Sequence, residues 1–254
     1  MTTLVLGATG ATGRLLVRQL LDRGEHVRAI VRSPGSLPAA LRDDERVSVI
    51  HASLLDLSDA ELVEHMRGCR AVASCLGHTL SFKGIFGAPR RLVTDATRRL
   101  CGAIGSVGPE QPVRFVLMNT AGNSNRDLNE PHSLGHRCVL GLLRLLLPPH
   151  VDNEQASDHL RGLRSDSVEW VVVRPDSLID EEQVSPYELH VSPTRDAIFD
   201  PGKTSRVNVG HLMAALITDD ALWDRWRGQM PVVYNTPDEA PSTGSATEGG
   251  EPSR

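Results

Sequence analysis

The feature that most constrains the fold is a glycine-rich stretch, GATGATG, at residues 7–13. It follows a short apolar run at Thr3–Leu6 and opens a helical pattern at Gly13–Arg23, which Gly24 ends. Glycines at a spacing of three let the backbone turn tightly and approach a pyrophosphate, whose charge a helix N-terminus favours. The alternative is an ordinary turn between strand and helix, but a second strand at His26–Val31 follows in register. We therefore predict a dinucleotide site that includes Gly7, Thr9, Gly10, Ala11, Thr12 and Gly13.

Beyond this stretch, β-branched runs alternate with helical patterns, which is typical of a parallel sheet built from βαβ units. The sequence predicts further strands at Val47–His51, Ala71–Cys75, Val113–Met118, Glu169–Val173 and Pro231–Tyr234. It predicts helices at Ser58–Arg67, Pro89–Ile104, Leu134–Leu147, Asn153–Leu163 and Val209–Ile217. We expect an α/β fold, a Rossmann-like doubly wound parallel sheet with helices on both faces and a small C-terminal substrate-covering portion.

The length of 254 residues does not by itself decide the number of domains. One NAD(P)-binding domain over residues 1–234 accounts for all the predicted elements. Residues 122–150 and 177–206 are expected to cover the substrate, and 177–206 are irregular and rich in Pro, Asp and Ser. Residues 235–254 contain almost no apolar side chain, so we predict a disordered tail there.

Charge and composition exclude several classes of partner. Lys and Arg number 27 against 32 Asp and Glu, a net charge of −5, and no long basic run is present. Such a chain is a poor candidate for binding nucleic acid or an anionic membrane. The four cysteines have no paired spacing, and no signal peptide or membrane-spanning run is apparent. We expect a cytoplasmic protein with a small-molecule substrate. The apolar helix at Leu134–Leu147 indicates core burial first, and a homodimer contact or a pocket wall second.

The residues after the second strand indicate which dinucleotide is bound. An NAD-specific site usually has Asp or Glu there, which accepts hydrogen bonds from the ribose hydroxyls. This chain has Arg32 and Ser33 instead, and a guanidinium pairs with a 2′-phosphate that NAD lacks. Arg14, just after the last glycine, adds a second cation. The alternative is a solvated surface arginine. We predict that NADP(H) is preferred over NAD(H).

Two further pairs of residues are candidates for the cofactor site. Asp56 and Leu57 follow the third strand, where such folds contact the adenine edge, although a loop aspartate before a helix is an equal alternative. Leu76 and Gly77 end the fourth strand, where a small residue lets the cofactor ribose pass.

With these motifs placed, the chain resembles the atypical, NmrA-like NAD(P)-binding branch of the short-chain dehydrogenase/reductase superfamily, and within it the flavin reductase / biliverdin-IXβ reductase group. The resemblance implies an NADP(H)-binding domain with a small pocket over the nicotinamide. It also implies cofactor contacts at Asn119 and Thr120 and, after the sixth strand, at Arg174, Pro175 and Ser177. The matching stretches are GATGATG, VRAIVRSPGSLP, AVASCLGHT, FVLMNTAG, VEWVVVRP and SRVNVGHLMAALIT.

The chain departs from this superfamily at its catalytic pair. Typical members reduce carbonyls with a Tyr-x-x-x-Lys pair on the helix before the sixth strand, whereas Tyr187 and Tyr234 both lie elsewhere. By register, His150 and Glu154 fall near the two positions, and Thr120 keeps a hydroxyl where relatives often have a catalytic serine. Thr120 and His150 are therefore the catalytic candidates, although His150 is also explained as the residue that ends a helix.

Three functions remain open at this point. A flavin, quinone or tetrapyrrole needs chiefly to be held against the nicotinamide, so a site without the tyrosine–lysine pair can reduce it. A redox-inactive NADP(H)-sensing regulator and a non-redox isomerase or lyase are the alternatives. A metal site is not predicted, because His132, His136 and His150 lack acidic or cysteine partners at fitting spacing.

Overall fold

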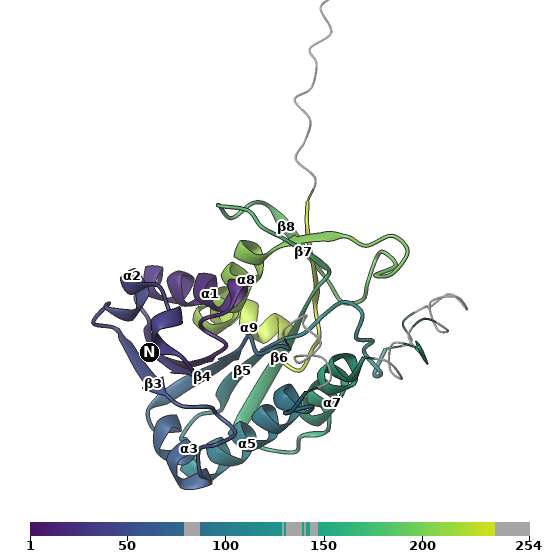
Figure 1. Cartoon of the computed structure of the whole chain (residues 1–254). Helices are drawn as coiled ribbons and strands as arrows, with labels where there is room; N and C mark the ends of the chain where they lie inside the picture. The colour runs from purple at the N-terminus through teal and green to yellow at the C-terminus, as the bar shows by residue number, and fades with distance from the viewer. Residues whose placement is uncertain (79–86, 129, 131–138, 140, 143–146, 237–254) are drawn as a thin grey trace, which may run out of the picture.

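A computed structural model of the chain describes residues 1–78, 87–128, 130, 139, 141–142 and 147–236 (Figure 1). Its main sheet has eight strands in the order β3-β2-β1-β4-β5-β6-β10-β8. Neighbouring strands run parallel, except that β8 is antiparallel to β10. The strands are Thr2–Leu6 (β1), His26–Val31 (β2), Val47–His51 (β3), Cys69–Ser74 (β4), Val113–Met118 (β5), Val168–Pro175 (β6), Tyr187–His190 (β8) and Val232–Asn235 (β10). The predicted Rossmann-like α/β fold is confirmed.

Helices cover both faces of this sheet (Figure 1). One face carries α1 (Ala11–Asp22), α8 (Arg206–Thr218) and α9 (Asp220–Trp226), and the other carries α3 (Asp59–Met66), α5 (Leu92–Val107) and α7 (Pro148–Gly162). A 3₁₀ turn at Pro34–Ser36 and the short α2 (Ala39–Arg42) follow β2. The sheet therefore lies between two apolar layers, each with its own core.

Strand β5 shows why a sheet buried on both faces reads as a continuous apolar run in the sequence. Its residues Phe115, Val116 and Leu117 are all fully buried. Successive side chains of a strand point to opposite faces. Accordingly, Val116 packs in the core beneath α1 and α8, while Phe115 and Leu117 pack in the core beneath α3, α5 and α7.

The start of α7 differs from the sequence prediction. The helix was expected from about Asn153, with Pro148 and Pro149 closing the preceding apolar helix. In the structure these two prolines begin α7. Proline is tolerated there because the N–H groups of the first helical turn have no partner within the helix. His150 consequently lies in the first turn of α7. The predicted apolar helix at Leu134–Leu147 falls largely outside the described residues.

The segment 177–206 was expected to be irregular, yet it contains three short strands. Ser177–Ile179 (β7) and Lys203–Ser205 (β9) pair in a separate two-stranded sheet, and β8 extends the edge of the main sheet. Strands of three or four residues are too short to give a periodic pattern. The tail predicted from residue 235 also needs correction at its first residue, because Asn235 ends β10. Residues 237–254 lie outside the described part.

Candidate functional site

Two adjoining cavities lie at the carboxyl ends of the parallel strands, beside the β1–β4 pair where the strand order reverses. We call them the β2 cavity, of about 280 Å³, and the α7 cavity, of about 310 Å³. Both are lined by Gly10, Cys75, Leu76 and Gly77, so together they form one cleft. The β2 cavity continues to Arg32, and the α7 cavity to Asn153.

The glycine loop forms the floor of this cleft through a tight backbone crossing. Gly7 has a φ of +71°, which glycine adopts without strain, and a Cβ there would lie 2.5 Å from the Cys75 carbonyl oxygen. A Cβ at Gly13 would lie 2.0 Å from the Gly7 carbonyl oxygen. The Gly10 N–H donates to that same oxygen at 2.9 Å. The loop brings the backbone of Gly10–Gly13 to the α7 cavity, and Gly7 and Thr9 to the β2 cavity.

The N-terminus of α1 opens toward the cleft without a competing anion. Gly10 occupies the N-cap position, no side chain caps the helix, and its first turn contains no acidic residue. The first N–H groups of a helix have no partner within the helix, and the helix dipole makes this end positive. The arrangement therefore suits a pyrophosphate, as the sequence predicts.

Arg32 and Ser33 lie side by side at the end of β2, and both are exposed. Arg32 lines the β2 cavity together with Thr9 and Gly10, and its carbonyl oxygen lies 3.0 Å from His51 Nε2. The structure thus places Arg32, but not Ser33, in the lining of the β2 cavity. Arg14 differs from the expectation, because it lines a separate cavity of about 540 Å³ between α1 and residues 182–184.

Asp56 and Leu57 lie outside the cleft, in contrast to the sequence prediction. The wall after β3 is formed by Ala52, Ser53 and Leu54. Beyond them the chain turns, with the Asp56 N–H donating to the Ser53 carbonyl at 3.0 Å, and Arg99 of α5 binds the Leu57 carbonyl. This turn directs the predicted pair away from the cavities.

Asn119 lies at the far end of the cleft and joins β5 to α7. Its Nδ2 donates to the Asn153 carbonyl at 2.9 Å, and its Oδ1 accepts from the Thr120 N–H at 2.9 Å. Asn119 and Asn153 both line the α7 cavity. Thr120 does not, because its hydroxyl turns back to accept from the Gly122 N–H at 3.3 Å. The structure therefore brings Asn119 to the cleft and leaves the catalytic candidate Thr120 beside it.

The residues of α7 that face the cleft are Pro149 and Asn153, four apart. His150 is displaced by one position from this face and is paired with Glu154 at 3.4 Å, with both side chains mostly buried. The register prediction placed His150 and Glu154 near the catalytic positions, but the residues that face the cleft are each one position earlier, Pro149 and Asn153. Because helical residues four apart share a face, this shift moves the whole pair off the cleft.

His78, which was not among the candidates, lines the α7 cavity directly after Gly77. Its Nε2 lies 2.8 Å from Oδ2 of Asp152, a fully buried carboxylate on α7. The available sequence signal was the position of His78 just beyond the carboxyl end of a parallel strand, where ligands bind in such sheets. Its partner is 74 residues away, so no local pattern marks the pair.

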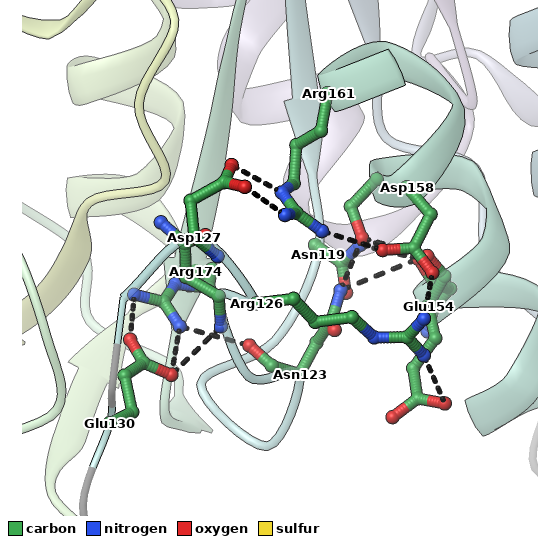
Figure 2. A network of polar contacts seen from close by, with 12 residues as sticks. Asn119, Asn123, Arg126, Asp127, Glu130, Glu154, Asp158, Arg161 and Arg174 are labelled. Carbon is green, nitrogen blue, oxygen red and sulfur yellow. Dashed lines mark hydrogen bonds and ion pairs between the residues drawn. The ribbon is translucent and has the colours of Figure 1, made fainter.

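Arg174 does not reach the cleft, contrary to expectation. Its side chain is fully buried, and its guanidinium pairs with Glu130 at 2.8 Å (Figure 2). It also donates to the backbone carbonyls of Asn123, Val191 and Met230. Pro175 is buried at the end of β6, where its carbonyl accepts from Ala121, and Ser177 lies in β7. None of the three predicted residues lines the two cavities.

The network around Arg174 instead fixes the loop after β5 against α7 (Figure 2). Asn123 Nδ2 donates to Ser157 Oγ at 2.7 Å. Arg126 pairs with Asp158 at 2.8 Å, and Arg161 pairs with both Asp127 and Asp158. These contacts attach the segment that begins at Asn119, and with it the far wall of the cleft, to α7.

Asp176, just after β6, is expected to make the stability of the fold depend on pH. Burial raises the pKa of Asp176, and the hydrogen bond from the Gly202 N–H, at 2.9 Å, opposes this. A carboxyl whose folded-state pKa is raised stabilises the fold below its unfolded pKa and loses that contribution as the pH rises through the folded pKa. We expect Asp176→Asn to raise the midpoint of urea unfolding relative to wild type more at pH 7 than at pH 4. A larger gain at pH 4 would contradict this assignment.

Two absences apply to the described residues alone. Within the described ranges no helix has both the length and the apolar character needed to cross a membrane. Nor do three His, Cys, Asp or Glu side chains of the described part gather as a metal site. His132 and His136 lie outside the described residues.

Comparisons with known proteins agree with this geometry. A family model described as NAD(P)H-binding matches residues 7–220. An uncharacterized chloroplastic protein of Arabidopsis thaliana is 26% identical over 205 residues, which is 79% of this chain and 64% of that protein. The chain therefore spans less than two thirds of that relative's length.

Solved structures show the same fold. An anaerobillin reductase of Escherichia coli O157:H7 matches with a TM-score of 0.66 at 17% identity, over 95% of this chain and 100% of that one. A short-chain dehydrogenase/reductase of Veillonella parvula in complex with NADP matches with a TM-score of 0.66 at 17% identity, over 92% and 94% of the two chains. At these identities the likeness shows the fold, and the family match shows that the chain is NAD(P)H-binding.

Proposed function

Because the chain belongs to the NAD(P)H-binding family, we propose that it is an NADP(H)-dependent oxidoreductase acting on a flat conjugated acceptor, such as a flavin, quinone or tetrapyrrole. The observation that carries this proposal is the cleft itself, which continues from Arg32 over the glycine loop to α7. Along its length the cleft offers a cation for the 2′-phosphate, a helix N-terminus for the pyrophosphate, and a polar end for the nicotinamide ribose.

The residues present fit NADP(H) at each of these three places. The exposed guanidinium of Arg32 would hold the 2′-phosphate, and the uncapped amides at the start of α1 would hold the pyrophosphate. Leu76, Gly77 and Asn119 would surround the nicotinamide ribose. When bound, the reduced cofactor supplies a hydride to the acceptor.

The α7 face explains why we propose a conjugated acceptor rather than an alcohol or ketone. Pro149 and Asn153, the residues of that face, carry neither a phenol nor an ammonium group. The tyrosine–lysine proton donor of typical relatives is therefore not supplied from α7. A planar acceptor held against the nicotinamide depends chiefly on orientation, which a rigid cleft provides.

We expect Arg32→Ala to raise the KM for NADPH about 10- to 100-fold and to leave the KM for NADH within about twofold. Hydrogen bonds to a charged group contribute about 1.5–3 kcal/mol, and each 1.4 kcal/mol corresponds to about tenfold in affinity. The measurement is the oxidation of each nucleotide with a panel of flavins, quinones and linear tetrapyrroles.

The matched control is Arg70→Ala, at the opposite end of the sheet, where the arginine pairs with Gln111 at 2.8 Å. It should change neither KM. Equal use of NADH and NADPH by the wild type would contradict the 2′-phosphate role of Arg32. Tight NADPH binding without turnover of any acceptor would instead identify the protein as an NADP(H)-sensing regulator.

A further inference from the structure

The pair of His78 and Asp152 is a fixed imidazole–carboxylate unit on the wall of the α7 cavity. His78 follows the end of β4, and its side chain is only 7% exposed. Asp152 lies one helical turn into α7, and its Oδ2 accepts from His78 Nε2 at 2.8 Å. Two elements far apart in the sequence thus converge at the end of the cleft where the nicotinamide is proposed to lie.

Asp152 is itself held by the N-terminus of α5. Its two carboxylate oxygens accept from the N–H groups of Val93 and Thr94 at 2.8 and 2.9 Å. The Thr94 hydroxyl donates to the Asp152 backbone carbonyl at 2.9 Å. A carboxylate with this many fixed donors has little freedom to rotate, so it fixes the orientation and the tautomer of the imidazole that it binds.

The chemistry of the α7 cavity singles out His78. Of the twelve described residues that line this cavity, Cys75 and His78 have titratable side chains. Burial raises the pKa of the Cys75 thiol to about 12, so it keeps its proton at neutral pH. The other polar side chains of the lining are the hydroxyl of Thr12 and the amides of Asn119 and Asn153, which are poor acids.

The described part of the chain places a negative charge beside His78. Asp152 faces it from α7, and α5 contributes the positive end of its helix dipole behind that carboxylate. The glycine loop and the end of β5 contribute no ionisable side chain to the cavity lining.

We propose that His78 is the proton donor to the acceptor during its reduction and that Asp152 is its positioning residue. This inference rests on the proposed reductase function. The acceptor gains a hydride, and hence two electrons, from the cofactor, and a negative charge develops on one of its heteroatoms. The imidazolium of His78, whose Nε2–H is bound by Asp152, gives its Nδ1 proton to that heteroatom, and solvent returns a proton to Nδ1 of the neutral ring. The sum is acceptor, NADPH and one proton converted to reduced acceptor and NADP⁺.

The test measures kcat and the KM for NADPH in His78→Gln and Asp152→Asn. The control is His26→Gln, at an exposed histidine at the start of β2. Glutamine keeps an N–H donor for Asp152, so the fold is retained. We expect His78→Gln to lower kcat about 100-fold, with the KM for NADPH within twofold of wild type. In the wild type kcat should fall with rising pH, as expected of a reaction that needs a protonated donor, and in His78→Gln this dependence should disappear.

A second readout is independent of turnover. The imidazole ¹H–¹⁵N signal that His78→Gln removes should shift when NADP⁺ is added, and the corresponding signal of His26 should not. An unmoved His78 signal, or full activity with the wild-type pH profile in His78→Gln, would overturn the role of His78 and leave the reductase function standing. A wild type that reduces no acceptor would overturn both the proposed function and the donor role.

Discussion

Arg174→Met is expected to lower the free energy of unfolding by about 3–5 kcal/mol, because it leaves a buried carboxylate without its partner. The side chains of Arg174 and Glu130 are 0% and 2% exposed, and they pair at 2.8 Å. Methionine has a similar volume but gives no hydrogen bond, so three backbone carbonyls lose the Arg174 donor. Glu130 loses its cationic partner and keeps the hydrogen bond from the Asn125 N–H at 2.8 Å. Urea unfolding followed by circular dichroism measures the loss.

Two further variants test whether burial is the cause. Arg195→Met breaks an ion pair with Asp200 of 2.6 Å, but these side chains are 49% and 65% exposed, so we expect almost no change in the free energy of unfolding. The double variant Arg174→Met with Glu130→Leu removes both buried charges and should recover a large part of the loss. A cost below about 1 kcal/mol for Arg174→Met alone would contradict the structural role of this pair.

The fold was most predictable where a strand has five or six residues and is rich in β-branched side chains. The ranges His26–Val31, Val47–His51 and Val113–Met118 agree with the structure at both ends. The start of α7 was missed because a proline pair ends one helix as readily as it begins another. The strands β7, β8 and β9 were missed because pairing between distant segments, rather than local pattern, defines them.

The residues of the site were likewise predictable where the sequence signal is local, and not where it depends on distant partners. The glycine loop could be predicted because its chemistry is local: seven consecutive residues form the turn and the helix N-terminus. Arg174 was assigned to the cofactor because the resemblance to the atypical short-chain dehydrogenases/reductases implies a contact there. Its guanidinium turns instead to Glu130, 44 residues earlier in the chain. His78 was missed because the meaning of a histidine depends on its partner, and Asp152 becomes a partner only when α7 packs on α5.

Gly13→Ala is expected to weaken NADPH binding at least about 100-fold, the largest effect we expect on the cofactor. The added Cβ would lie 2.0 Å from the Gly7 carbonyl oxygen and 2.7 Å from its carbon. Both atoms belong to the backbone, so no side chain can rotate away, and the loop and the start of α1 must separate. That movement displaces the amides proposed to hold the pyrophosphate, which act only when fixed toward it. Isothermal titration calorimetry with NADPH measures the change.

The loss of NADPH affinity should be larger the closer an added Cβ lies to the backbone around it. At Gly10 the Cβ would lie 3.2 Å from the same oxygen, so Gly10→Ala should weaken binding less than Gly13→Ala does. At the exposed Gly105 of α5 a Cβ would meet nothing within 4 Å, so Gly105→Ala should leave the Kd unchanged and stabilise the helix by up to about 1 kcal/mol. An unchanged Kd in Gly13→Ala would show that the loop does not hold the cofactor, because a backbone clash of this size cannot be relieved without moving the loop.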